Sequence, residues 1–224
     1  MATSRIKGYG VTGFAATSSS VTASTTAGTS GDIHVAQLLV TTDAANVTAP
    51  SGWTQISTKH DIDGGPSSGE PQATYWWWKD DGSTTSAQWS WSTGNQDRSV
   101  WVEVIRGCDG TTPVQTTSFK QSTSAGTATS NSGVTLTADG AVLLYVSNDG
   151  GQIASNTPTN YTRQNNTLDQ AVYTRVALTS GHTTGTLSVT IGGSADWISD
   201  IIALQVPLAA VVTHQSLMTM GVGS

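Results

Sequence analysis

The chain has 224 residues, which allows one large all-β domain or two small ones, and it combines 37 Thr and 28 Ser with only 11% charged residues. Its net charge of −6 and its lack of a basic patch argue against nucleic acids and anionic membranes as partners, because binding to phosphates needs clustered Lys and Arg. The single cysteine, Cys108, excludes an internal disulfide and points to folding in a reducing cytoplasm.

The chain begins with an arm that leads into buried strands. Residues 1–30 are rich in Ser, Thr and Gly and are expected to form an N-terminal strand or arm. Residues 31–40 start with turn residues and continue as an apolar run, which predicts a buried strand. Residues 50–54 (PSGWT) then predict a turn that leads into the next strand.

An aromatic segment completes the first half. Residues 75–79 (YWWWK) and 88–92 (QWSWS) are β-strand patterns, and the Asp-Asp-Gly-Ser between them is a turn sequence. We therefore expect these two strands to form a hairpin. A long apolar strand is predicted at residues 99–105.

The second half of the chain repeats this order. Residues 109–138 predict a linker with an edge strand near 114–119, in the place that residues 1–30 have in the first half. Residues 139–148 match 31–40 at an offset of 108, and PTNYT matches PSGWT at the same offset. Gly opposite Asn fits a turn, because both residues tolerate a positive φ. The remaining strands are expected at 171–176, 186–190 and 196–204, the first two paired as a hairpin.

These patterns predict an all-β fold, an antiparallel β-sandwich with an internal duplication and extended N- and C-terminal arms. The expected boundaries are 1–30 for the N-terminal strand or arm, 31–108 for the first sandwich repeat, 109–138 for the linker with its edge strand, 139–207 for the second repeat and 208–224 for the C-terminal arm.

The order of the motifs resembles a module of tailed-bacteriophage virion proteins and related bacterial surface proteins. The resemblance is carried by Gly31-Asp32 and by residues 50–54, 75–82, 89–91 and 106–110 (RGCDG). It implies a jelly-roll-like sandwich and a role on the particle as head decoration, head fibre or tail fibre. It implies no catalytic residues.

The tryptophans are the strongest signal from single residues. Because successive side chains of a strand face opposite sides, the predicted hairpin is aromatic on both faces. One face fits a core, and the other must meet a sugar, another subunit or the rest of this chain. The candidate binding residues are Trp76, Trp77, Trp78, Trp89 and Trp91.

No catalytic residue, metal site or cofactor is predicted. Glu103 and Asp200 lie in corresponding closing strands, as a pair of glycosidase carboxylates would, but strand alternation also explains them as outward-facing polar positions. Residues 61–64 begin like a calcium loop, yet Gln72 stands where the loop needs its last carboxylate. The four histidines do not share a metal-ligand spacing, and Cys108 is interpreted as a structural thiol.

The C-terminal segment is too short to cross a membrane and too apolar for a solvated tail. We expect residues 208–224 to form an anchoring arm that docks on another subunit by β-augmentation. The apolar residues of this arm are Leu208, Val211, Val212, Leu217, Met218 and Met220.

The sequence thus predicts a non-enzymatic structural protein of a bacteriophage virion, with capsid decoration or head fibre favoured. The expected partners are the major capsid or tail protein, further copies of this chain and a cell-surface glycan, with no nucleic acid and no membrane. The N-terminus has no signal-peptide pattern, so the expected location is a virion made in the host cytoplasm. The alternative is a carbohydrate- or receptor-binding tail fibre module that uses the Trp-rich face.

Overall fold

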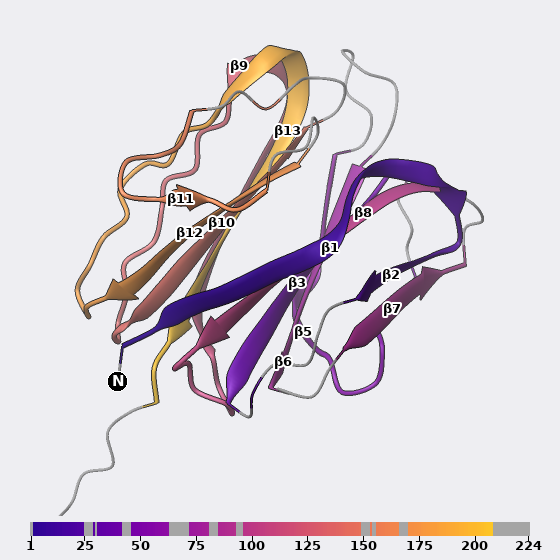
Figure 1. The fold of residues 1–224 in the computed structure, drawn as a ribbon. Coiled ribbons are helices and arrows are strands. Elements are labelled where there is room, and N and C mark those ends of the chain that lie inside the picture. The colour runs from indigo at the N-terminus through magenta and orange to yellow at the C-terminus, as the bar shows by residue number, and fades with distance from the viewer. Residues whose placement is uncertain are drawn as a thin grey trace, which may run out of the picture.

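The computed structural model describes residues 2–24, 29, 31–41, 46–62, 72–80, 85–92, 96–148, 153, 156–165 and 170–207. All regular elements in these ranges are β-strands, and all paired strands are antiparallel, as the sequence predicts. Three sheets are arranged in layers, with two five-stranded sheets face to face (Figure 1). The architecture is therefore that of a β-sandwich.

Each five-stranded sheet is built from one half of the chain. The first has the order β1 (Ser4–Ser18), β8 (Gln96–Arg106), β3 (Asp32–Val40), β6 (Gln72–Asp80) and β5 (Thr54–Ile62). The second has the order β9 (Val114–Ala128), β13 (Thr190–Gln205), β10 (Gly140–Asn148), β12 (Gln170–Leu178) and β11 (Thr162–Arg163). The two orders correspond strand by strand. In each sheet the first long strand of its half, β1 or β9, lies at one edge beside the last strand of that half, β8 or β13.

A smaller layer covers the outer face of each large sheet. In the first half this layer is a three-stranded sheet of β2 (Ser20–Ser24), β7 (Ser86–Trp91) and β4 (Val47–Thr48). In the second half the same place is taken by two less regular segments that meet at the bridges Asn131–Leu187 and Thr135–Thr183. Each half thus has its own outer core, and a third core lies between the two large sheets.

The turns predicted from PSGWT and PTNYT are both present. The amide of Trp53 donates to the carbonyl of Pro50 at 3.3 Å, and the amide of Tyr161 donates to the carbonyl of Pro158 at 3.0 Å. The residue before each aromatic has a positive φ, 82° at Gly52 and 66° at Asn160. This conformation explains why Gly and Asn alternate at that position.

The two predicted hairpins are wrong. β6 pairs with β3 and β5 in the first large sheet, whereas β7 pairs with β2 and β4 in the small sheet. In the second half, β12 pairs with β10 and β11, and Leu187 instead bridges to Asn131. After β6 in the first half and after β12 in the second, the chain crosses from the large sheet to the covering layer. The two segments predicted to pair as a hairpin therefore lie in different layers and pack through their apolar faces.

The central strands β3 and β10 are buried along all nine of their residues. One face of each strand contacts the covering layer of its own half. The other face contributes to the core shared by both halves, which includes Val35, Ile105, Leu143 and Leu204. The continuous apolar runs in the sequence therefore reflect burial on both faces.

The shared core predicts that the two halves unfold together. Leu143→Ala removes a fully buried side chain from this core and should lower the free energy of unfolding by about 2–5 kcal/mol. Seven of the eight tryptophans precede residue 109, so tryptophan fluorescence reports mainly on the first half. In urea titrations, we expect fluorescence and far-UV circular dichroism to fall in one coincident transition at a lower midpoint than wild type. A fluorescence midpoint that stays at the wild-type value would show that the halves fold independently.

Candidate functional site

The core between the large sheets contains buried polar side chains beside its apolar ones. We call the polar part the polar strip, which consists of Gln37, Thr74, Ser99, Glu103, Gln170 and Asp200. The amide of Gln170 donates to Oε1 of Gln37 at 2.5 Å and accepts from the hydroxyl of Ser99 at 3.1 Å. Since Gln170 belongs to the second half, these bonds connect the two sheets.

Glu103 is held at the centre of this interface by a charged partner. Nε of Arg5 donates to Oε2 of Glu103 at 2.6 Å, and Nε1 of Trp101 donates to Oε1 at 2.6 Å. The Glu103 side chain is fully buried, whereas that of Arg5 is 25% exposed. Burial raises the pKa of the Glu103 carboxyl, and the bonds from Arg5 and Trp101 partly oppose this rise.

Asp200 is bound by the opposite half of the chain. Its Oδ2 accepts from Nε1 of Trp76 at 2.8 Å and from the hydroxyl of Thr74 at 3.1 Å. Its Oδ1 lies 3.6 Å from Nδ1 of His60, whose ring packs against Phe119 with 3.7 Å between centroids and an angle of 40° between the ring planes. The arrangement ties β13 to β5 and β6.

The structure corrects the interpretation of these two carboxylates as outward-facing positions. Each faces away from the core of its own half, as alternation requires, but the other large sheet covers that face. Glu103 and Asp200 are both 0% exposed. A substrate cannot reach either carboxylate in this state, and both act as acceptors for buried donors.

The Trp-rich binding face is also corrected. Trp76, Trp77, Trp89 and Trp91 are at most 5% exposed and lie within the cores of this chain. Trp78 is partly buried against the core between the large sheets. The sequence left a sugar, another subunit or the rest of this chain as the partner of the second aromatic face, and the rest of this chain covers it. Within the described residues, Ile6 is the exposed large hydrophobic residue, at 38%.

The motif residues near Gly31-Asp32 and Arg106-Gly107 form one structural unit. Nε and Nη2 of Arg106 donate to Oδ1 and Oδ2 of Asp32 at 2.8 and 3.1 Å. This bidentate pair joins the start of β3 to the end of β8, where the two residues are direct partners in the ladder. The bonds from Arg106 lower the pKa of Asp32 to about 2. The sequence shows both motifs but not that they meet.

The other residues considered as reactive or metal-binding groups, Cys108, His34 and Asp61, are buried or paired within the chain. Burial raises the pKa of the Cys108 thiol to about 12, so it stays protonated. Nδ1 of His34 shares a hydrogen bond of 2.9 Å with the hydroxyl of Tyr9 in the buried interior. Asp61, from the calcium-like sequence, pairs with Nζ of Lys59 at 2.8 Å. Within the described residues, no group of three or more His, Cys, Asp and Glu side chains is placed to hold a metal ion.

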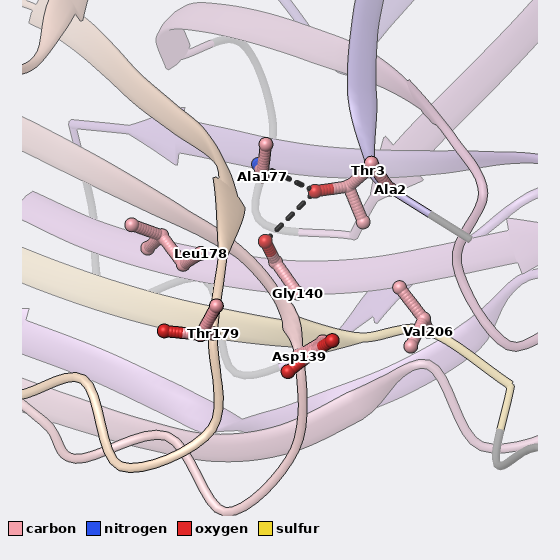
Figure 2. A pocket seen from close by; sticks show the side chains of 8 residues that line it. All are labelled: Ala2, Thr3, Asp139, Gly140, Ala177, Leu178, Thr179 and Val206. Atoms are coloured by element: carbon pink, nitrogen blue, oxygen red, sulfur yellow. Dashed lines mark hydrogen bonds between the residues drawn. The ribbon is translucent and has the colours of Figure 1, made fainter.

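A pocket of about 280 Å³ lies where the two ends of the folded body meet (Figure 2). Ala2 and Thr3 from the start of the chain and Val206 from its end line this pocket. The hydroxyl of Thr3 donates to the carbonyl of Gly140 at 2.7 Å and accepts from the amide of Ala177 at 2.9 Å. The start of the first half is therefore bound to the sheet of the second.

Comparison with family models, curated proteins and solved structures gave no match. No helix long and apolar enough to cross a membrane occurs in the part of the chain that the structure describes. The predicted arm, residues 208–224, lies outside the described residues, and so do its apolar residues Leu208, Val211, Val212, Leu217, Met218 and Met220. The geometry of the described residues therefore carries the functional argument.

The Asp32–Arg106 pair predicts an acid-dependent contribution to stability. A carboxyl whose pKa is lower in the folded state stabilises the fold above its unfolded pKa, near 3.8, and loses this effect as pH falls toward the folded value of about 2. Asp32→Asn should thus be less stable than wild type at pH 7, and the difference should shrink below pH 3.8. Urea midpoints of both proteins from pH 7 to pH 2 measure this, and a difference that is constant over this range would contradict it.

The Arg5–Glu103 pair predicts a strongly non-additive double-mutant cycle. Arg5→Met leaves a buried carboxylate without its cation and should cost about 3 kcal/mol at pH 7. Because a raised carboxyl pKa favours the folded state at low pH and penalises it as pH rises, this loss should be smaller at pH 4. Adding Glu103→Gln removes the charge but keeps an acceptor for Trp101, so the double variant should recover most of the loss. Additive costs in chemical denaturation would contradict the assignment.

Proposed function

We propose that this protein is a non-enzymatic structural component of a tailed-bacteriophage particle, where it decorates or projects from the surface. The observation that carries the proposal is the position of the chain ends. Ala2, Thr3 and Val206 line one pocket, so both ends of the described body lie at the same end of the molecule (Figures 1 and 2). The body can therefore be attached to a particle through that one end. The rest of the body is then free to project.

The described body suits such a role because it is braced as one unit. The shared core joins both large sheets, and the bonds of Thr3 fix the start of the chain onto the second sheet. At the other end, the amide of Val206 donates to the carbonyl of Asp139 at 2.9 Å. The start of the chain is thus bound to β10 and β12, and its end is bound to the residue just before β10.

We infer further that the two halves are copies of one jelly-roll-like unit. The corresponding strand orders and the two equivalent turns support this inference. The resemblance of the motif order to virion modules supports it independently. Under this proposal, residues 31–108 and 139–207 are the repeats, and residues 1–30 and 109–138 supply the edge strand of each.

The arm of residues 208–224 is proposed to anchor the body to the major capsid or tail protein. It follows Pro207 at the end that also carries Ala2, and it is rich in apolar residues. Burying such a side chain contributes roughly 1.5–3 kcal/mol, against about 1–2 kcal/mol per residue for ordering the backbone. A partner surface that adds main-chain hydrogen bonds would make the free energy of docking favourable. The location is accordingly the virion, with homo-oligomers on the particle and no cofactor.

Truncation after Pro207 tests the anchor. The truncated chain should remain folded, with a thermal midpoint within a few degrees of the full chain, because the described cores end at Val206. Its occupancy on particles of the encoding phage, measured by cosedimentation and mass spectrometry, should fall at least tenfold. Full-length protein absent from purified particles would overturn the virion proposal. A truncated chain that keeps normal occupancy would overturn the anchor alone.

A further inference from the structure

A polar groove lies at the edge of the second sheet, near the chain-end pocket. Arg5 and Val176 line the groove, and Thr3 and Ala177 line the pocket. The groove has a volume of about 460 Å³ and is open to solvent. Its walls come from the start of β1, the turn before β11, β11 itself and β12. The polar side chains that line it are Arg5, Asn160, Thr162, Gln164, Thr174 and Arg175.

Arg175 gives this groove a positive charge. In the described part of the chain, Arg175 has no hydrogen bond and no ion pair, whereas Arg5 is neutralised by Glu103. The chain has a net charge of −6 and only nine Lys and Arg in total. An arginine without a carboxylate partner at the rim of a polar groove is therefore placed for an anion from outside the chain.

A local irregularity of the backbone accompanies Arg175. β12 has one more residue than β10 between the pairs Val142–Arg175 and Gly140–Leu178, and Ala177 within this bulge has a φ of 56°. The corresponding pairing of β3 and β6 runs without a register shift. Bulges bend a strand and re-aim its side chains, and a positive φ at a non-glycine residue costs energy. Part of this irregularity serves the fold, because the amide of Ala177 donates to the hydroxyl of Thr3 and so holds the start of the chain.

The groove also presents fixed neutral groups. Nε2 of Gln164 donates to the carbonyl of Thr162 at 3.0 Å and to the hydroxyl of Thr174 at 2.5 Å. These bonds hold the amide in place and leave Oε1 of Gln164 as an acceptor and the Thr174 hydroxyl as a donor. The side chains of Asn160 and Thr162 are exposed beside them. Several donors and acceptors thus surround one guanidinium.

We propose that this groove binds an acidic saccharide. Arg175 pairs with the sugar carboxylate, and Asn160, Thr162 and Gln164 bond to the neighbouring hydroxyls. A guanidinium matches a carboxylate by two parallel hydrogen bonds, and amide and hydroxyl side chains match sugar hydroxyls, which both donate and accept. The partly buried Val176 supplies an apolar surface for the C–H face of the ring. The site does not depend on the virion proposal.

The first half of the chain provides a matched control. Val35 and Leu143 are equivalent by the offset of 108, and their partners are Trp78 and Thr174, so Lys79 is the counterpart of Arg175. Lys79 likewise lies beside the turn that precedes the next strand, close to Gly52. Lys79→Gln removes the same charge as Arg175→Gln from the equivalent strand position, but outside the groove.

The test is calorimetric titration of the full chain with trigalacturonate and with sialyllactose, beside the neutral sugar lactose and sodium sulfate. We expect saturable binding of at least one acidic sugar, weaker binding at higher salt, and no comparable binding of lactose or sulfate. Arg175→Gln should weaken binding at least tenfold and Thr162→Val about threefold, and Lys79→Gln should leave it unchanged. Thermal unfolding of each variant verifies its fold.

The opposite results would overturn the proposal. These are the absence of saturable binding to both acidic sugars, or equal losses in Arg175→Gln and Lys79→Gln, which would mean binding to net charge. Sulfate binding as tight as the sugar would show an anion site without sugar recognition. If Arg175→Gln does not fold, Arg175→Lys keeps the charge without the planar fork, and it should still bind several-fold more weakly.

Discussion

The packing of one five-stranded sheet against the other is the constraint on which the rest of the structure depends. Each large sheet already has a covering layer on its outer face, so the contact between the sheets leaves its central strands no face for water. A polar group on the inner face therefore costs free energy unless it has a partner within the chain. Asp200 finds Trp76 and Thr74 across the interface, and Glu103 finds Arg5 and Trp101. A buried polar contact of this kind fixes one relative position of the sheets, because a shift by one residue would leave charged and polar atoms unpaired.

Because both faces of the large sheets are buried, a binding surface cannot lie on their central strands. The aromatic side chains that would make a binding platform are used to fill cores, and large polar faces are used to join the halves. What stays accessible are strand edges, turns and the end where the chain enters and leaves. The groove beside Arg175 lies at such an edge, and the pocket at Thr3 and Val206 lies at that end. Among the described residues, binding is therefore expected at polar strand edges, which the cores leave exposed.

The sequence was sufficient for most strands and for the equivalent turns. The hydrophobic pattern and the turn residues placed β3 and β10 within one residue and β12 within two, and Gly52 and Asn160 have the positive φ that a turn at these positions predicts. It was not sufficient for pairing, because alternation shows which side chains share a face but not whether that face meets a neighbour in the same sheet or in the next layer. Trp77 and Trp89 illustrate this, since their rings meet across the outer core at a tilt of 41° with 6.1 Å between the ring centroids. The burial of Glu103 and the contact of Asp32 with Arg106 depend on tertiary structure in the same way, and no local pattern encodes them.

Two halves with corresponding strand order offer an internal way to separate folding from function. Features that recur, such as the turn before β5 and β11 or the buried runs of β3 and β10, follow from the shared architecture. Features present in one half alone need another explanation. The bulge at Ala177 is such a feature, because β3 and β6 pair without it, and its amide donates to the hydroxyl of Thr3 at the start of the chain. The bond to Thr3 accounts for the bulge but not for Arg175, which no carboxylate of the described residues neutralises, and the groove that Arg175 lines is where we expect a ligand.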